Sequence, residues 1–231
     1  EYRSIELAQI AVQGPKSREL LVNLGAAVLE GLKLHHTCDA TIGGLLCLLA
    51  RTGYTGELGY EIYIDAAKVG SLWDLLVEKG VVWGLKPAGL GARDLLRLEM
   101  GYLLYGNDMG EDTTPLEANA DWTVSFAKGE FIGSRGLLAQ KQAGVTRRFV
   151  AFELTEKAVP RHGFRILDPA TSLPIGDVTS GNLSPLLQKG IGLGYVPVRF
   201  AEPGSSILIE IRNKTVPAHI VKPPFYKRKK S

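Results

Sequence analysis

The chain has 231 residues, of which 45% are hydrophobic and 22% are charged, and its formal net charge is +3. These values are typical of a globular protein with one large domain or two smaller ones. No apolar run approaches the roughly 18 residues that a membrane-spanning helix needs. The first residues also lack the charged-then-apolar opening of a signal peptide. We therefore expect a globular protein that is not bound to a membrane.

Strands and helices follow one another in the first part of the chain. Tyr60, Ile62 and Ile64 are expected on one face of a strand, and Glu61 and Tyr63 on the other. Strands are predicted at the N-terminus, at 45–50 and at 60–64, an extended segment at 81–86, and helices at 17–25, 66–79 and 87–100. This order favours an α+β fold with a mixed sheet.

The pattern changes after Gly144. Short β-type runs, separated by Pro, Gly and Asn, are predicted at 148–154, 164–167, 175–180, 191–196, 206–212 and 216–221. Such a series predicts an all-β barrel or sandwich. Because 142–146 has the composition of a linker, we expect an α+β region at 1–145 and a β-barrel domain at 146–231.

Cysteine and histidine give no sign of a metal or a disulfide. Cys38 and Cys47 are nine residues apart and form no CxxC pair, and a structural disulfide is not expected in a chain of this size and composition. His35 and His36 lie close to Cys38, but the spacing is not that of a zinc site. We expect an ordinary loop there and no bound metal.

A basic run, Lys227-Arg228-Lys229-Lys230, closes the chain. Such a run either binds nucleic acid or acidic lipid, or is a solvated tail. The rest of the chain is nearly neutral and has no stripe of basic residues interleaved with exposed aromatic ones. We expect no nucleic-acid partner; salt-sensitive binding that is lost when 227–230 are removed would indicate one.

The most polar helical segment lies at 91–108. Arg93 and Arg97 are four residues apart and so project from one helix face. Either acids such as Asp94 and Glu99 pair with them, or a bound anion compensates their charge. The residues alone leave both alternatives open.

Glu61 is a carboxylate in the middle of a predicted strand. It is either a solvated strand residue or a rigidly held group. In the second case it can accept two parallel hydrogen bonds from an N–H/NH₂ edge, such as that of a pterin or guanine ring. The glycines of 190–194 are not a dinucleotide fingerprint, because no helix follows them. No nucleophile–base pair is evident.

Several motifs occur in an order and spacing that are together specific. They are Gly53-Tyr-Thr-Gly-Glu57, Gly59-Tyr-Glu-Ile62, Gly89-Leu-Gly-Ala-Arg-Asp-Leu-Leu-Arg-Leu-Glu99, Leu104-Tyr-Gly-Asn-Asp108, Thr114-Pro-Leu-Glu117, Asp121-Trp-Thr123, Thr179-Ser-Gly-Asn-Leu-Ser-Pro185 and Gly194-Tyr-Val-Pro197. Over nearly the whole chain they resemble the aminomethyltransferase (T-protein) family of the glycine cleavage system.

This resemblance implies a reaction and its partners. An aminomethyl group passes from the lipoyl arm of the H-protein to tetrahydrofolate. Ammonia leaves, methylenetetrahydrofolate forms and the reduced lipoyl carrier is released. No metal is implied. The location implied is the cytoplasm, or the mitochondrial matrix in a eukaryote.

The resemblance also implies a folate site. Glu61 and Arg93 match the family's folate-binding Glu and Arg, and Tyr105 and Trp122 match aromatic positions that line or support the site. Tyr226 and Arg228 match a basic or aromatic contact near the C-terminus. Arg97 is then expected to be a structural ion-pair partner.

One family feature has no counterpart here. The family's catalytic Asp lies in an N-terminal segment ahead of the position where this chain starts, and neither Glu57 nor Asp108 matches it. We therefore assign no catalytic residue and expect this chain to be inactive alone. The alternatives are a folate-binding relative without transfer activity and a folate-dependent demethylase or dehydrogenase domain.

Overall fold

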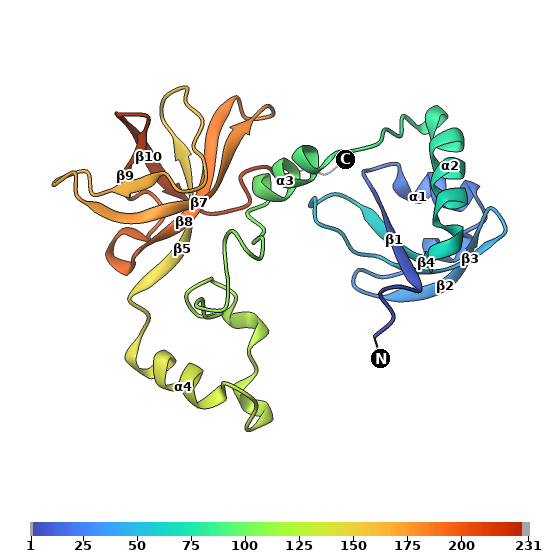
Figure 1. The fold of residues 1–231 in the computed structure, drawn as a ribbon, viewed down its shortest axis with the longest axis horizontal. Helices are drawn as coiled ribbons and strands as arrows, with labels where there is room; N and C mark the ends of the chain where they lie inside the picture. The colour runs from blue at the N-terminus through green and yellow to red at the C-terminus, as the bar shows by residue number, and fades with distance from the viewer. Residues whose placement is uncertain (1, 228–231) are drawn as a thin grey trace. The chain divides into compact units, whose positions relative to one another are not determined.

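The computed structural model describes residues 2–227, and the chain divides into two compact units, residues 1–96 and 97–231 (Figure 1). Helix α3 (Leu90–Glu99) contains the division between them. Each unit has a sheet and a hydrophobic core of its own. The predicted boundary between 145 and 146 stays a prediction.

The first unit is a four-stranded sheet with helices against one face. Its sheet has the order β1-β4-β3-β2, and all its pairings are antiparallel. The strands are β1 (Leu7–Gln13), β2 (Thr37–Ile42), β3 (Leu45–Ala50) and β4 (Gly59–Asp65). The helices are α1 (Ser17–Asn23) and α2 (Val69–Gly80), with short 3-10 helices η1 (Ala27–Glu30), η2 (Ala66–Lys68) and η3 (Val81–Trp83).

Side-chain alternation sets the two faces of this sheet. Tyr60, Ile62 and Ile64 are buried, as predicted, in a core that also contains Leu20 of α1 and Leu72 of α2. The helices therefore cover the face opposite to that of Glu61. Asp65 accepts a hydrogen bond from the backbone N–H of Ala67, which caps the helical segment that follows β4.

Three expectations for this unit need correction. Cys38, expected in a loop beside the histidines, belongs to strand β2, whose inward residues are Cys38, Ala40 and Ile42. Residues 81–83 form a 3-10 helix instead of an extended segment. The sheet is antiparallel and not mixed, because short connections such as the Gly43-Gly44 turn join antiparallel neighbours.

The second unit contains a closed β-barrel in the order β10-β5-β8-β7-β6-β9. An α+β fold followed by a C-terminal barrel is thus confirmed. The strands are β5 (Arg147–Leu154), β6 (Arg165–Leu167), β7 (Pro174–Ser184), β8 (Lys189–Pro197), β9 (Ser206–Ile211) and β10 (Lys214–Val221). Before the barrel come the 3-10 helices η4 (Asp121–Thr123) and η5 (Phe126–Lys128) and helix α4 (Ser134–Ala143), and η6 (Val198–Phe200) lies between β8 and β9.

The glycines of β8 serve packing. A Cβ at Gly192 would meet the ring of Phe152, and one at Gly190 or Gly194 would meet backbone oxygens of Ala158 or Asp177. Only glycine leaves room for the segments packed against this strand. The rejection of a dinucleotide fingerprint at 190–194 agrees with this environment.

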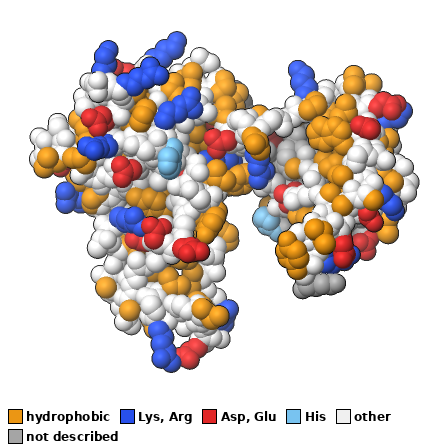
Figure 2. Space-filling view, in the orientation of Figure 1, with side chains coloured by type: hydrophobic (Ala, Val, Ile, Leu, Met, Phe, Trp, Pro, Cys, Tyr) orange, Lys and Arg blue, Asp and Glu red, His pale blue; other side chains and the backbone are white. Residues whose placement is uncertain are grey.

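The surface mixes charges of both signs. Figure 2 shows Lys and Arg side chains interspersed with Asp and Glu on the face drawn. Among the described residues, no helix is both long and apolar enough to cross a membrane. In the same part of the chain, no group of three or more His, Cys, Asp or Glu residues could hold a metal ion. Cys38 and Cys47 are free thiols.

Candidate functional site

Glu61 lies on the sheet face of the first unit that the helices leave uncovered. Its register partners are Ala11 in β1 and Ala50 in β3, so small side chains lie on both sides of the half-buried carboxylate. Tyr63, two residues along the same face, donates a hydrogen bond to Glu61 Oε2 at 3.4 Å. Burial, and then the charge of Glu61 and this hydrogen bond, raise the pKa of Tyr63. This arrangement favours a rigidly held Glu61 carboxylate over a solvated one.

The loop before β4 is wrapped around the side chain of Gln13. Gln13 Nε2 donates to the carbonyl oxygens of Thr52 and Tyr60 at 3.2 Å, so the amide connects both ends of the loop. A Cβ at Gly53 or Gly59 would overlap the Gln13 amide. Glycine at both positions therefore lets the Gln13 amide lie this close to the loop. They explain the glycine spacing of the motif just ahead of Glu61.

Arg93 is anchored to the same loop. Its guanidinium carbon lies 4.9 Å from the centroid of the Tyr54 ring, which is a cation–π contact. The Arg93 side chain is otherwise exposed on α3. The first unit thus connects both principal predicted residues to segment 53–59, Glu61 through the strand that follows it and Arg93 through Tyr54.

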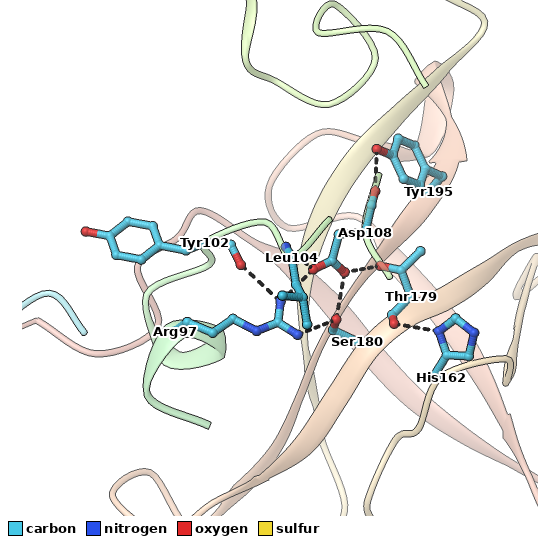
Figure 3. Close-up of polar contacts among 8 residues, drawn as sticks. All are labelled: Arg97, Tyr102, Leu104, Asp108, His162, Thr179, Ser180 and Tyr195. Carbon is cyan, nitrogen blue, oxygen red and sulfur yellow. Dashed lines mark hydrogen bonds and ion pairs between the residues drawn. The ribbon is translucent and has the colours of Figure 1, made fainter. Parts of the chain in front are cut away.

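Arg97, one helical turn after Arg93, has a different environment. It is only 1% exposed, and its Nη1 forms an ion pair with Asp108 Oδ2 at 2.5 Å (Figure 3). Nη1 also donates to the carbonyl oxygen of Tyr102 at 3.0 Å, and Nη2 donates to Ser180 Oγ at 2.7 Å. Arg97 is therefore the structural ion-pair partner that was predicted, and the partner is Asp108.

The Asp108 carboxylate accepts hydrogen bonds both from residues at and just after the end of α3 and from residues of strand β7. In Figure 3 its carboxylate lies between the helix end and strand β7. Oδ1 accepts hydrogen bonds from Thr179 Oγ1 at 2.5 Å and Ser180 Oγ at 2.7 Å. Oδ2 accepts one from the backbone N–H of Leu104 at 2.9 Å, in addition to the ion pair. A buried carboxylate with this many donors is electrostatically compensated.

The other predicted site residues lie in the second unit. Tyr105 is 65% exposed in the turn that Asp108 closes, and Trp122 is 84% exposed in η4. The backbone N–H of Tyr226 donates to the carbonyl oxygen of Glu99 at 3.2 Å, so Tyr226 lies at the end of α3. Arg228 lies outside the described residues.

A second polar network joins the segment before the barrel to β5. Arg147 Nε donates to Glu117 Oε1 at 3.0 Å, and Thr114 donates to Glu117 Oε2 through its backbone and hydroxyl. Burial alone would raise the pKa of Glu117, but the hydrogen bonds from Thr114 and Arg147 outweigh it and lower the pKa. Burial also raises the pKa of Tyr195 to about 12; its hydroxyl donates to the carbonyl oxygen of Asp108.

Two sequence models of one family match most of the chain. The GCVT N-terminal domain matches residues 1–128, and the glycine cleavage T-protein C-terminal barrel domain matches 147–227. The chain belongs to the glycine cleavage T-protein family. The barrel match coincides with strands β5 to β10, and the resemblance inferred from the sequence motifs is confirmed.

Aminomethyltransferases from several organisms align along nearly the whole chain. An aminomethyltransferase of Halothermothrix orenii is 49% identical over 218 residues, and one of Thermoanaerobacter pseudethanolicus is 46% identical over 226 residues. These matches cover 94% and 97% of this chain, which spans about 60% of the relatives' length. The crystal structure of glycine cleavage system aminomethyltransferase T from Bartonella henselae has a TM-score of 0.84 at 31% identity. That match covers 95% of this chain and 60% of the solved one.

Sequence reasoning missed two supporting residues of the candidate site. No sequence motif assigned a role to Gln13, whose amide holds the loop before Glu61. Tyr63 was placed on the Glu61 face, but its hydrogen bond to the carboxylate was not foreseen. The available signals were the paired Gly53 and Gly59 and the two-residue period of the strand.

Proposed function

We propose that the protein containing this chain is a tetrahydrofolate-dependent aminomethyltransferase of the glycine cleavage system. It moves the aminomethyl carbon from the lipoyl arm of the H-protein to tetrahydrofolate. Ammonia leaves, methylenetetrahydrofolate forms and the reduced lipoyl arm is released. The observation that carries the proposal is the family match over both parts of the chain, with named aminomethyltransferases at 46–49% identity.

Glu61 is proposed to recognise the pterin ring. A carboxylate accepts two parallel hydrogen bonds from an N–H/NH₂ edge, and its register neighbours Ala11 and Ala50 have small side chains. The hydrogen bond from Tyr63 limits the rotation of the carboxylate. Orientation of this kind reduces the entropy that binding costs.

Arg93 is proposed to supply the complementary positive charge. A guanidinium can meet either a pterin oxygen or the anionic glutamyl tail of folate, and both are acceptors. The Tyr54 ring restrains Arg93, which is an exposed residue. Tyr105, Trp122, Tyr226 and Arg228 complete the proposed folate contacts, the aromatic ones by stacking.

None of these residues is proposed to act as a nucleophile, because the folate amine attacks the aminomethyl carbon. The residues of this chain bind and orient folate. Their contribution is one of positioning, which lowers the barrier by fixing the reacting atoms relative to one another. No catalytic residue is assigned within the chain.

The proposal is tested with the full-length protein as its gene encodes it. It is mixed with tetrahydrofolate and with H-protein that carries an aminomethyl group on its lipoyl arm, and methylenetetrahydrofolate and ammonia are measured. Both products are expected in equal amounts, and only when folate is present. Folate binding without either product would indicate the binding-only alternative. Folate-dependent loss of methyl groups from a methylated amine or sulfonium would indicate the demethylase alternative.

A further inference from the structure

The turn that carries Tyr105 is built around Asp108. The backbone N–H groups of Asn107 and Asp108 donate to the carbonyl oxygen of Leu104 at 3.1 and 2.8 Å. In return, the backbone N–H of Leu104 donates to the Asp108 carboxylate. Because Asp108 accepts and donates across the same turn, its carboxylate fixes the backbone on both sides of Tyr105.

The Tyr105 side chain has little packing of its own to hold it. It is 65% exposed, so its place depends on the backbone of the turn more than on neighbouring side chains. That backbone is closed by the hydrogen bond from Gly106 N–H to the carbonyl oxygen of Met109 at 2.9 Å, beside a bridge between Tyr105 and Met109. A change in the Asp108 contacts would therefore disturb the backbone that places Tyr105.

The barrel fixes Asp108 itself. Thr179 and Ser180 of β7 donate to Oδ1, and Tyr195 of β8 donates to the Asp108 carbonyl oxygen at 2.8 Å. Figure 3 shows these three side chains around Asp108 on the barrel side, with Arg97 opposite. A rigid sheet thus holds the carboxylate, and the carboxylate holds the turn.

We propose that Asp108 is a positioning residue that holds Tyr105 for contact with bound folate, an inference that rests on the proposed function. Asp108 does not touch folate in this account. It acts through the Leu104–Asp108 turn, and Thr179 and Ser180 transmit the rigidity of the barrel to it. The network therefore contributes to affinity in addition to its contribution to stability.

The test is a double-mutant cycle in the full-length protein. Asp108→Asn leaves the Arg97 charge unbalanced and can prevent folding, so the informative variant is Thr179→Val, which keeps the side-chain shape and removes one donor to Asp108. It is made in the native background and in Tyr105→Ala. The matched control is Ile209→Val in the barrel core, which lowers the melting temperature without touching the turn.

Anaerobic calorimetric titration with tetrahydrofolate gives Kd for each protein, and thermal unfolding gives Tm. We expect Thr179→Val to raise Kd about threefold to tenfold, because folate must then order a turn that the native network already holds in place. The increase should vanish in the Tyr105→Ala background because the two sites are coupled. Ile209→Val should lower Tm and leave Kd unchanged.

Two outcomes would overturn the inference. If Thr179→Val lowers Tm but leaves Kd unchanged, the network is structural only. If it raises Kd equally with and without Tyr105, the network acts through another group. Tyr105→Ala, Glu61→Ala and Arg93→Ala are measured alongside. Unchanged Kd in all three would reject the proposed folate site itself, and so separates the two failures.

Discussion

At the residue scale, the two arginines of α3 differ in burial and in their partners. Arg93 and Arg97 lie on the same helix face, but Arg97 is 1% exposed and paired with Asp108, whereas Arg93 is exposed over Tyr54. Removing one partner of a buried ion pair costs about 3–5 kcal/mol, because the other charge is left without compensation. Arg97 is therefore held in place by Asp108, and Arg93 remains open to a ligand.

Glu117 makes the free energy of unfolding depend on pH in the acidic range. The folded-state pKa of Glu117 lies below its ordinary value of 4.5. The ionised carboxylate therefore makes its full contribution to the stability of the folded state above that pH. The contribution is lost as the pH falls through the lowered pKa. We expect the free energy of unfolding to fall less steeply from about pH 5 to pH 3 in Glu117→Gln than in the native protein.

Urea unfolding at several pH values measures this difference. The control is Glu78→Gln, since Glu78 is an exposed acid whose one ion pair within residues 2–227 is with its neighbour Lys79. Its slope should match that of the native protein. Equal slopes for Glu117→Gln and the native protein would show that the Glu117 network does not lower that pKa.

At the element scale, the periodicity of apolar residues predicted the elements that bury large apolar side chains and missed elements that do not. Strand β4 and helix α2 were predicted within a few residues because their large apolar side chains repeat at the spacing of a strand or a helix. Strand β2 was missed because its inward residues include the small Cys38 and Ala40. Helix α4 was missed because none of its residues is buried, so no apolar stripe marks it.

One glycine in β8 and one in α4 give a prediction about stability. Alanine at Gly192 would force its Cβ against the Phe152 ring in a fully buried site, and overpacking of this kind costs about 1–3 kcal/mol. Gly136 lies within α4 with open space around it and ordinary helical backbone, so alanine there should stabilise the protein by roughly 0.5–1 kcal/mol.

Chemical denaturation of both variants distinguishes packing from backbone entropy. The packing account requires shifts of opposite sign, with Gly192→Ala less stable and Gly136→Ala more stable than the native protein. If Gly192→Ala were as stable as the native protein or more stable, the close approach at β8 would not be the reason for its glycines.

At the scale of the whole molecule, the sequence predicted the fold class and the barrel, and the motifs indicated the family. It did not predict which distant residues meet. Asp108, Thr179 and Ser180 were each quoted within motifs, yet their contact depends on the path of the chain through a closed barrel. Gln13 and the loop before Glu61 are a second example, separated by about forty residues. Local periodicity carries no information on such contacts.

The central claim is that Glu61 and Arg93 bind folate. Its most direct test is titration of the full-length protein with tetrahydrofolate, comparing Glu61→Ala and Arg93→Ala with Asp39→Ala. Asp39 is an exposed acid on the same sheet face that has no proposed role. We expect each of the first two variants to weaken binding at least tenfold, since hydrogen bonds to charged groups contribute about 1.5–3 kcal/mol, and the control to bind normally. Unchanged affinity in Glu61→Ala and Arg93→Ala would contradict the account.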